Sequence, residues 1–516
     1  MLTLLHTSDW HLGRRLYGKP RYDEFKQFLD WQLQTLREQK VDVLLIAGDI
    51  FDTTAPSNQA QNLYYDFLSQ VCHTDCRHVI IVAGNHDSAS FLEAPKQLLK
   101  AFNIHIIGSM TDTPTDEVIT LSDKSGQPEL IVMAVPYLRD RDVRTVGHGE
   151  RLDDKERKLA QGIKAHYAQI ADIAIAQQAQ LKAKYKRSIP IVATGHLFTV
   201  GGQTMEGDGV RDLYVGSLGS IGAEIFHPQI DYVALGHLHI PQAVGGQPHI
   251  RYAGSPIAMG FGESRQQKQV HLLRFDANPD LLSQPLQTLT IQKKPLVSAP
   301  TPVKKRKSVS HTSMDLFADE ELPESSMLGA INAEAEIEVA IDAQASYKAQ
   351  YDTPSDHLSG QMSEQKLSGQ SSGQPYNVAK LSDTTLLQSL PVPVFQPIQT
   401  LKGDWQTIKT SLHSLKKSQQ SVWLEVVYDG QEVVGDLSEK IAELVKDSRL
   451  EVLRIKNQQK RDQVMQSQRM DESLEELNPT QVFERCLIAH QVLEEQKPML
   501  WSRYTEVLES LQGGQQ

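Results

Sequence analysis

The sequence predicts an α/β protein whose first 275 residues form a layered domain with a metal site at its strand ends. Two observations predict this. Short apolar runs alternate with amphipathic stretches of helical length along this part of the chain. Acidic, amide and histidine side chains follow five separate strand candidates, and the carboxyl ends of strands are where sites assemble in open α/β sheets.

The first strand candidate is the short run Leu4–Leu5, and further apolar runs supply the others. These are Val43–Ala47, Val79–Ala83, Leu130–Val135, Ile189–Thr194 and Tyr232–Leu235. Helical patterns occupy Tyr22–Glu38 and Ala60–Val71. Residues Ala160–Lys186 are rich in Ala, Gln and Lys, which predicts a long and mostly exposed helix.

The chain has 516 residues, which is too long for one hydrophobic core, so we expect two or three domains. Residues 298–385 are loaded with Ser, Gln, Glu, Asp and Gly and are poor in aromatic residues. Such a segment cannot bury enough apolar surface to offset the entropy lost on ordering. We therefore predict a low-complexity, disordered insertion between two ordered parts.

A second ordered part is predicted after the insertion. Ser421–Tyr428 and Leu450–Ile455 have strand patterns, and Leu437–Val445 between them fits a helix, which together form a small α+β unit. Asn478-Pro479 is a helix start, and a helical segment over 478–511 follows. Its apolar stripes can pack on their own domain or dock a partner helix, and both alternatives stay open.

Charge and cysteine content restrict the function classes only weakly. The formal net charge of −12 counts mildly against a nucleic-acid binder, although metal ions and a partner subunit can supply positive charge. Three cysteines, Cys72, Cys76 and Cys486, do not suggest a disulfide framework. The start does not resemble a signal peptide and no apolar run is long enough for a membrane helix, so a reducing cytoplasm is expected.

The residues after the strand candidates form a pattern that chance explains poorly. They are Asp9 and His11, Gly48-Asp49, Gly84-Asn85-His86-Asp87, Gly195-His196 and Gly236-His237-Leu238-His239. Each piece alone is more often a strand-end turn or a cap. Together they offer a number of ligands suited to two divalent cations about 3.5–4 Å apart. Imidazole with carboxylate and amide oxygen suits Mn, Fe or Zn.

The motif order D-x-H, GD, GNHD, GH and GHxH resembles the calcineurin-like metallophosphoesterase superfamily. Within it, several segments resemble the SbcD family of bacterial nuclease subunits. They are SDWHLGRRL, LLIAGDIFDTTAPS, VAGNHDSASFLEAP, YVALGHLHIPQ and YAGSPIAMGFGE. The resemblance implies a two-sheet αββα sandwich over 1–275. It also implies a small α+β capping domain of 276–297 plus 386–465, with a first strand at Gln287–Gln292.

The resemblance also implies a role for each site residue. The metal ligands fall into two groups with one shared residue. They are Asp9, His11 and His239 for one ion, Asn85, His196 and His237 for the other, and Asp49 as the bridge. His86 would touch the phosphate and stabilise or protonate the leaving oxygen, and Asp87 would orient His86.

The implied activity is that of a manganese-dependent DNA nuclease in recombination, replication and repair. It would act as an exonuclease on duplex ends and as an endonuclease on single strands and hairpins. The alternative is a phosphatase or cyclic-nucleotide phosphodiesterase on the same core. The implied partner is an SbcC-type coiled-coil ATPase in a two-plus-two complex, docked by the helices after Asn478. Ala60–Val71 and Phe91–Phe102 would mediate self-association.

Overall fold

The computed structural model describes residues 1–144, 152–199, 221–275, 378–430, 434, 436–458, 483, 487 and 497–504. Two β-sheets lie face to face in the first part of the chain, and a smaller sheet follows. Outside the described residues lie 276–297 with the strand predicted at Gln287–Gln292, most of 478–511, and residues 298–377 of the insertion predicted over 298–385.

The first sheet has seven strands in the order β14-β15-β13-β1-β4-β5-β6. Their bounds are β1 (Leu2–Thr7), β4 (Val43–Ala47), β5 (His78–Val82), β6 (Ile104–Ile107), β13 (Gln269–Phe275), β14 (Val378–Lys380) and β15 (Thr385–Pro391). Strands β1, β4, β5 and β6 are parallel, so their carboxyl ends lie at one edge of the sheet. Strand β13 closes the other side of β1 in antiparallel register.

The second sheet has six strands in the order β11-β12-β10-β9-β8-β7. Their bounds are β7 (Val118–Ser122), β8 (Pro128–Met133), β9 (Ile191–His196), β10 (Tyr232–Gly236), β11 (Gln242–Val244) and β12 (Gln247–Tyr252). Strands β8, β9, β10 and β12 are parallel. Because β9 and β10 are central and continuously buried, their ends deliver side chains into the middle of the molecule.

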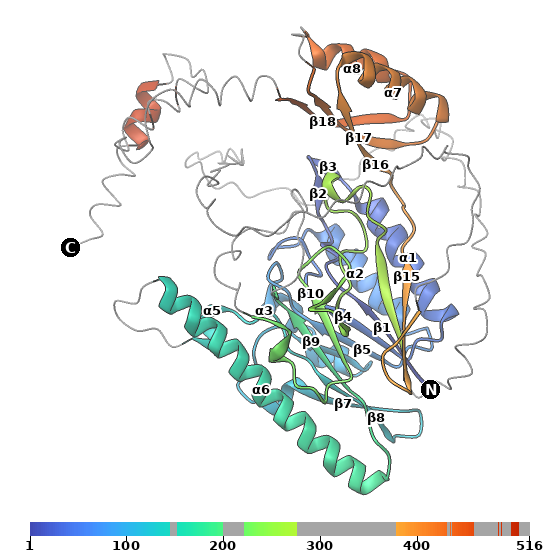
Figure 1. The fold of residues 1–516 in the computed structure, drawn as a ribbon, viewed down its shortest axis with the longest axis vertical. Helices are drawn as coiled ribbons and strands as arrows, with labels where there is room; N and C mark the ends of the chain where they lie inside the picture. The colour runs from blue at the N-terminus through green and yellow to red at the C-terminus, as the bar shows by residue number, and fades with distance from the viewer. Residues whose placement is uncertain are drawn as a thin grey trace, which may run out of the picture. The chain divides into compact units, whose positions relative to one another are not determined.

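Helices cover the outer face of each sheet, as the sequence predicts (Figure 1). Helices α1 (Tyr22–Glu38) and α2 (Asn58–Val71) pack on the first sheet, and α6 (Leu152–Tyr185) packs on the second. A third apolar cluster fills the space between the sheets. The α/β sandwich with two sheets is therefore confirmed.

The prediction that the long helix is mostly exposed is wrong for its first half. Helix α6 buries Leu159, Ile163, Tyr167 and Ile170 against the second sheet. These side chains recur at helical spacing, but the many Ala, Gln and Lys residues around them hide that stripe in the composition.

Short elements connect the strands. They are β2 (Arg15–Leu16), β3 (Lys19–Pro20), α3 (Ala89–Glu93), α4 (Lys96–Lys100), α5 (Asp140–Val143), η1 (Pro114–Glu117), η3 (Ala223–Ile225) and η4 (Phe261–Glu263). No helix in the ranges given above is both long and apolar enough to cross a membrane.

The small unit is a three-stranded parallel sheet with two helices. Its elements are β16 (Ile398–Gly403), α7 (Trp405–Ser418), β17 (Val422–Tyr428), α8 (Leu437–Val445) and β18 (Leu450–Asn457). The predicted strand–helix–strand is confirmed, and β16 and α7 precede it. Trp423 of β17 packs with Leu16 and Phe261 of the first domain in one buried cluster.

One predicted domain boundary is wrong. Strand β15 pairs with β13 along its whole length, so residues 386–391, predicted to open the second part of the small domain, belong to the first sheet. Strand β14 adds to the same edge and lies entirely inside the segment 298–385 predicted as a low-complexity insertion, so that prediction is wrong for these residues. More than one hundred residues separate β13 from β15, and strand pairing over that distance leaves no local signal in the sequence.

Candidate metal centre

The predicted site residues lie at the carboxyl ends of five parallel strands and come together between the two sheets. Strands β1, β4 and β5 of the first sheet carry Asp9, His11, Asp49, Asn85 and His86, and strands β9 and β10 of the second carry His196, His237 and His239. All are buried except Asn85 and His237, which are half-buried.

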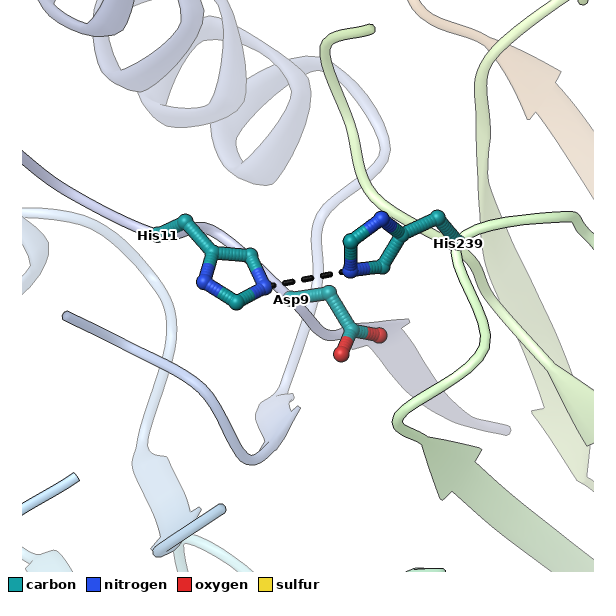
Figure 2. Close-up of side chains that lie close together, drawn as sticks. All are labelled: Asp9, His11 and His239. Carbon is teal, nitrogen blue, oxygen red and sulfur yellow. Dashed lines mark hydrogen bonds between the residues drawn. The ribbon is translucent and has the colours of Figure 1, made fainter. Parts of the chain in front are cut away.

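The first group consists of Asp9, His11 and His239 (Figure 2). One ligand-type atom from each lies within 4.8 Å of the others. The Nε2 atoms of His11 and His239 are 3.1 Å apart, and Asp9 lies beside them. Two imidazoles and a carboxylate therefore converge as the sequence predicts.

The second group is built around the side-chain amide of Asn85. Its Oδ1 lies 3.0 Å from Nε2 of His196 and 3.0 Å from Nδ1 of His237. His196 donates its Nδ1–H to the carbonyl oxygen of Ala47 at 2.9 Å, so Nε2 is the ring nitrogen that faces the group.

Asp49 lies between the two groups. Its Oδ2 is 3.6 Å from Nε2 of His11 and 3.3 Å from Nε2 of His196. Its Oδ1 accepts a hydrogen bond from the backbone N–H of His86 at 2.9 Å. One carboxylate thus contacts a member of each group while the other oxygen fixes the neighbouring loop.

The predicted relationship between Asp87 and His86 needs correction. His86 Nδ1 lies 2.8 Å from the carbonyl oxygen of Asp52, which therefore orients the ring. The Asp87 carboxylate instead accepts hydrogen bonds from the backbone N–H groups of Gly84, Ile50 and Phe51. Its role is to hold the loops after β4 and β5 together. Asp87 is adjacent to His86 in the sequence, but the sequence does not show which groups the Asp87 side chain contacts.

Several loop residues have unusual backbone conformations. Asp9, His11, Asp49 and His237 all have positive φ angles, between 47° and 103°. Such angles are uncommon outside glycine and cluster at functional sites. The loop that carries Asp9 and His11 is anchored in the core by Trp10, which lies between them in sequence. Trp10 is fully buried and packs edge-on against Phe28 and Phe67.

The strand-end glycines permit the loops to approach one another. A Cβ atom on Gly84 would collide with the Asp49 side chain, and one on Gly236 would collide with the carbonyl oxygen of Ala47. A Cβ atom on Gly48 would collide with the His196 ring. The glycine before each of these site residues is therefore required by close contact between loops.

Electrostatics follow from burial and from the Asp49 charge. Burial alone would lower the pKa of His196, but Asp49 beside it raises that pKa to about 9. Burial would raise the pKa of Asp49, yet the nearby histidines hold it well below its usual range. Burial and the His196 charge lower the pKa of His237 to about 3. Asp49 therefore stays ionised, as a bridging ligand must be.

This donor set fits a pair of divalent metal ions. Imidazole nitrogens, carboxylates and one amide oxygen are ligands for Mn, Fe or Zn. Nε2 atoms of two histidines that face each other at 3.1 Å leave room for only one proton between them, and a cation satisfies both.

Two carboxylates behind the ligands were missed. Asp52 Oδ1 lies 3.5 Å from Nδ1 of His11, and Glu263 Oε1 lies 3.3 Å from Nδ1 of His239. Both residues fall within the segments GDIFD and GFGE that carry the family resemblance, so a signal existed. It gave no indication of which atoms the side chains contact.

Comparison with known proteins agrees with this geometry. A family model described as calcineurin-like phosphoesterase matches residues 2–241, and one described as type 5 capsule protein repressor C-terminal domain matches residues 394–491. The SbcD protein of the nuclease SbcCD from Escherichia coli K12 is 30% identical over 516 residues, which cover 99% of each chain. The chain belongs to the SbcD family. It is thus a hydrolase of the phosphoesterase class.

SbcD proteins of other bacteria match somewhat more than half of the chain. The Rhodobacter capsulatus SbcD protein is 33% identical over 278 residues, covering 53% of this chain and 66% of its own. The Bacillus subtilis SbcD protein is 32% identical over 298 residues, covering 57% and 71%.

Proposed function

We propose that the chain is the manganese-dependent DNA nuclease subunit of an SbcC–SbcD-type complex. It would degrade duplex ends as an exonuclease and cut single strands and hairpins as an endonuclease, in DNA recombination, replication and repair in the bacterial cytoplasm. The observation that carries the proposal is Asp49 Oδ2, which lies within 3.6 Å of imidazole nitrogens from both groups. That is the arrangement of a bridging carboxylate.

Two Mn²⁺ ions would be held by Asp9, His11 and His239 and by Asn85, His196 and His237, with Asp49 between them. When bound, they would supply a nucleophilic water and neutralise the charge that develops on the phosphate. The protein's contribution is to hold these side chains rigidly before the substrate arrives.

His86 would act directly on the substrate. It is buried and its ring is fixed by the bond from Nδ1 to the Asp52 carbonyl oxygen, which leaves Nε2 as the ring nitrogen available to a phosphate. The ring lies 4.8 Å from the His11 ring, next to the first ligand group. A proton on Nε2 would stabilise or neutralise the leaving oxygen.

The test is digestion of linear duplex and hairpin DNA with Mn²⁺, compared with cleavage of a small chromogenic phosphodiester. We expect His86→Gln to abolish DNA cleavage while two Mn²⁺ ions still bind. Full activity in that variant would refute the role of His86. Cleavage of the small ester with DNA untouched would refute the nuclease proposal in favour of a small-substrate phosphoesterase.

We also propose that residues 478–511 dock the SbcC-type ATPase. Phe483 stacks on Tyr504 with ring centroids 3.9 Å apart, and Trp501 packs edge-on against both. Met499, two residues before Trp501, is 65% exposed. An aromatic cluster flanked by an exposed methionine is the kind of surface that coiled coils bind.

Self-association is proposed through the region around Phe91–Phe102 together with Ala60–Val71. Leu98 and Phe102 are 67% and 55% exposed, which is unusual for large apolar side chains.

Two variants test these two surfaces separately. Truncation after Asn478 should abolish co-purification with the ATPase and spare cleavage of simple substrates. Leu98→Lys with Phe102→Lys should instead yield a monomer by light scattering. A retained ATPase complex or a retained dimer would refute the respective surface.

A further inference from the structure

A buried carboxylate outside the ligand motifs lies behind one candidate ligand. Glu263 is fully buried in the turn η4, and its Oε1 lies 3.3 Å from Nδ1 of His239. The other oxygen, Oε2, accepts hydrogen bonds from Met259 N at 3.1 Å and Ser255 Oγ at 3.3 Å. The carboxylate is therefore held in one orientation.

Lys268 stabilises the charge of this carboxylate. Its ammonium group forms an ion pair with Glu263 Oε2 and also donates to the carbonyl oxygen of His239 and to Ser255 Oγ, each at 3.0 Å. Lys268 thus binds both the carboxylate and the backbone of the ligand that the carboxylate contacts. A buried charge pair with this many hydrogen bonds fixes geometry more than it adds stability.

The turn is also held from its other side. Phe261 stacks on Tyr17 and packs with Leu16 and Trp423. Phe261 and Glu263 are the first and last residues of the short turn η4, so packing of Phe261 also holds the backbone that carries the Glu263 carboxylate.

The contact determines which nitrogen of His239 faces the site. When Nδ1 donates its proton to Glu263, Nε2 carries a lone pair, and Nε2 is the atom that points at His11 (Figure 2). A carboxylate that accepts from the far nitrogen makes an imidazole a stronger metal ligand.

The second ligand group has different support. His196 donates its Nδ1–H to the neutral carbonyl of Ala47, and Asn85 replaces a carboxylate with an amide. Asp9 lies within 4.8 Å of ligand atoms in both groups, so it does not distinguish them. The first group differs because one of its histidines, His239, is backed by a carboxylate, which makes that imidazole the stronger ligand.

We propose that Glu263, supported by Lys268, is a positioning residue that holds His239 for metal binding and makes the Asp9–His11–His239 site the tighter of two Mn²⁺ sites. The proposal rests on the metal ligands assigned under the proposed function. It adds to them an order of binding: the first ion enters this site and the second enters the Asn85–His196–His237 site.

The test is titration of the full-length protein with Mn²⁺ alone, followed by calorimetry and by the electron paramagnetic resonance of free Mn²⁺. We expect two binding events in the wild type. Glu263→Gln should weaken the tighter event about 10- to 100-fold and leave the weaker one unchanged. Because that change removes the negative charge that faces the Lys268 ammonium group, Glu263→Gln with Lys268→Met is measured too, and the same selective loss is expected.

Glu117→Gln is the matched control. Glu117 is also fully buried and also contacts a histidine, with Oε2 2.8 Å from Nε2 of His166, but that pair lies between η1 and α6. It should leave both affinities unchanged. An unchanged tighter event in both Glu263 variants, or an equal weakening of both events, would overturn the proposal. So would the same selective loss in Glu117→Gln.

Variants of the ligands themselves distinguish the positioning role of Glu263 from the assignment of the metal ligands. His239→Ala should remove the tighter event, and Asn85→Ala should remove the weaker one. Two intact events in His239→Ala would overturn the ligand assignment and the positioning role together. Loss of one event in His239→Ala with none of the expected effect in the Glu263 variants would overturn the positioning role alone.

Discussion

The two sheets contribute unequally to the candidate metal centre. The first supplies every carboxylate and amide of the two ligand groups, namely Asp9, Asp49 and Asn85, together with one histidine. The second supplies only histidines. The first-sheet carboxylates also hold the backbone in place. Asp49 and Asp87 accept hydrogen bonds from main-chain N–H groups of first-sheet loops. Asp9 Oδ1 accepts one from the N–H of His237, in a loop of the second sheet, at 2.9 Å.

This asymmetry assigns two tasks to the first sheet. Asp9 and Asp49 each use one oxygen to fix a loop, and both carboxylates lie within the candidate metal-binding groups. The second sheet's loop at His237 is itself positioned by a first-sheet residue. We infer that substitutions of Asp9 or Asp49 damage both halves of the site, whereas second-sheet substitutions damage one.

The largest effect is expected from Asp49→Ala. It removes the group that contacts both halves and also frees the N–H of His86. We expect a loss of about a thousandfold or more in nuclease activity and loss of both Mn²⁺ ions. His196→Ala is the second-sheet comparison and should retain one ion. Anomalous scattering that shows two fully occupied metal positions in Asp49→Ala would refute the bridging role.

Asp87→Ala should be the most destabilising change of the series. It leaves three buried backbone donors without their acceptor, at Gly84, Ile50 and Phe51. Each unsatisfied donor costs about 1–3 kcal/mol, so we expect a loss of about 3 kcal/mol or more in the free energy of unfolding, measured in urea. Asp87→Asn keeps one acceptor oxygen and should lose less. An unchanged urea midpoint in Asp87→Ala would show that the loops do not depend on this carboxylate.

Gly236→Ala tests the contact between the sheets from the second side. Its Cβ would meet the carbonyl oxygen of Ala47 and the His196 ring. We expect about 2 kcal/mol of destabilisation together with reduced Mn²⁺ binding. Gly126→Ala is the control, because its Cβ meets nothing within 4 Å and only its φ of +79° is unfavourable. If Gly126→Ala lost as much unfolding free energy and Mn²⁺ binding as Gly236→Ala, the close contact at Gly236 would not be the cause of the loss.

How far the sequence predicts this molecule depends on the range of the interaction. Val43–Ala47, Tyr22–Glu38 and Leu437–Val445 are predicted with the bounds that the structure has, because local periodicity determines them. The ligand types are visible because each follows its own strand. The pairing of β15 with β13 and the contact between Glu263 and His239 depend on tertiary proximity, so neither could be predicted from local pattern.

The pH dependence of stability tests the layer between the sheets. His6 Nδ1 lies 2.9 Å from the Tyr232 hydroxyl of the second sheet, and its ring lies 5.8 Å from that of His271. Burial first, and then the charge of Arg251, lower the pKa of His271 to about 3. In the unfolded chain this pKa is about 6.5. The folded protein therefore binds fewer protons than the unfolded chain between these values, and stability falls as the pH drops from 6.5 towards 3.

At pH 5 the His271 contribution amounts to about 2 kcal/mol lost relative to pH 7. His271→Gln should flatten that part of the urea-unfolding profile, whatever its effect at pH 7. His413→Gln, at an exposed position of α7, should leave the slope unchanged. A slope that stays the same in His271→Gln would show that other groups carry the acid sensitivity.

The smallest effect is expected from removing the segment between β13 and β14. Phe275 and Thr385 are paired in the antiparallel register of β13 and β15, so a short linker can join the two sides once residues 281–372 are deleted. We expect a change below about 0.5 kcal/mol in unfolding free energy and unchanged nuclease activity, because the entropy of closing a loop depends only weakly on its length. A longer deletion that also removes β14 and β15 should expose Leu272, Leu273 and the adjoining edge of the first sheet and prevent folding. If the short deletion were as damaging as the long one, residues 281–372 would be part of the first sheet's support.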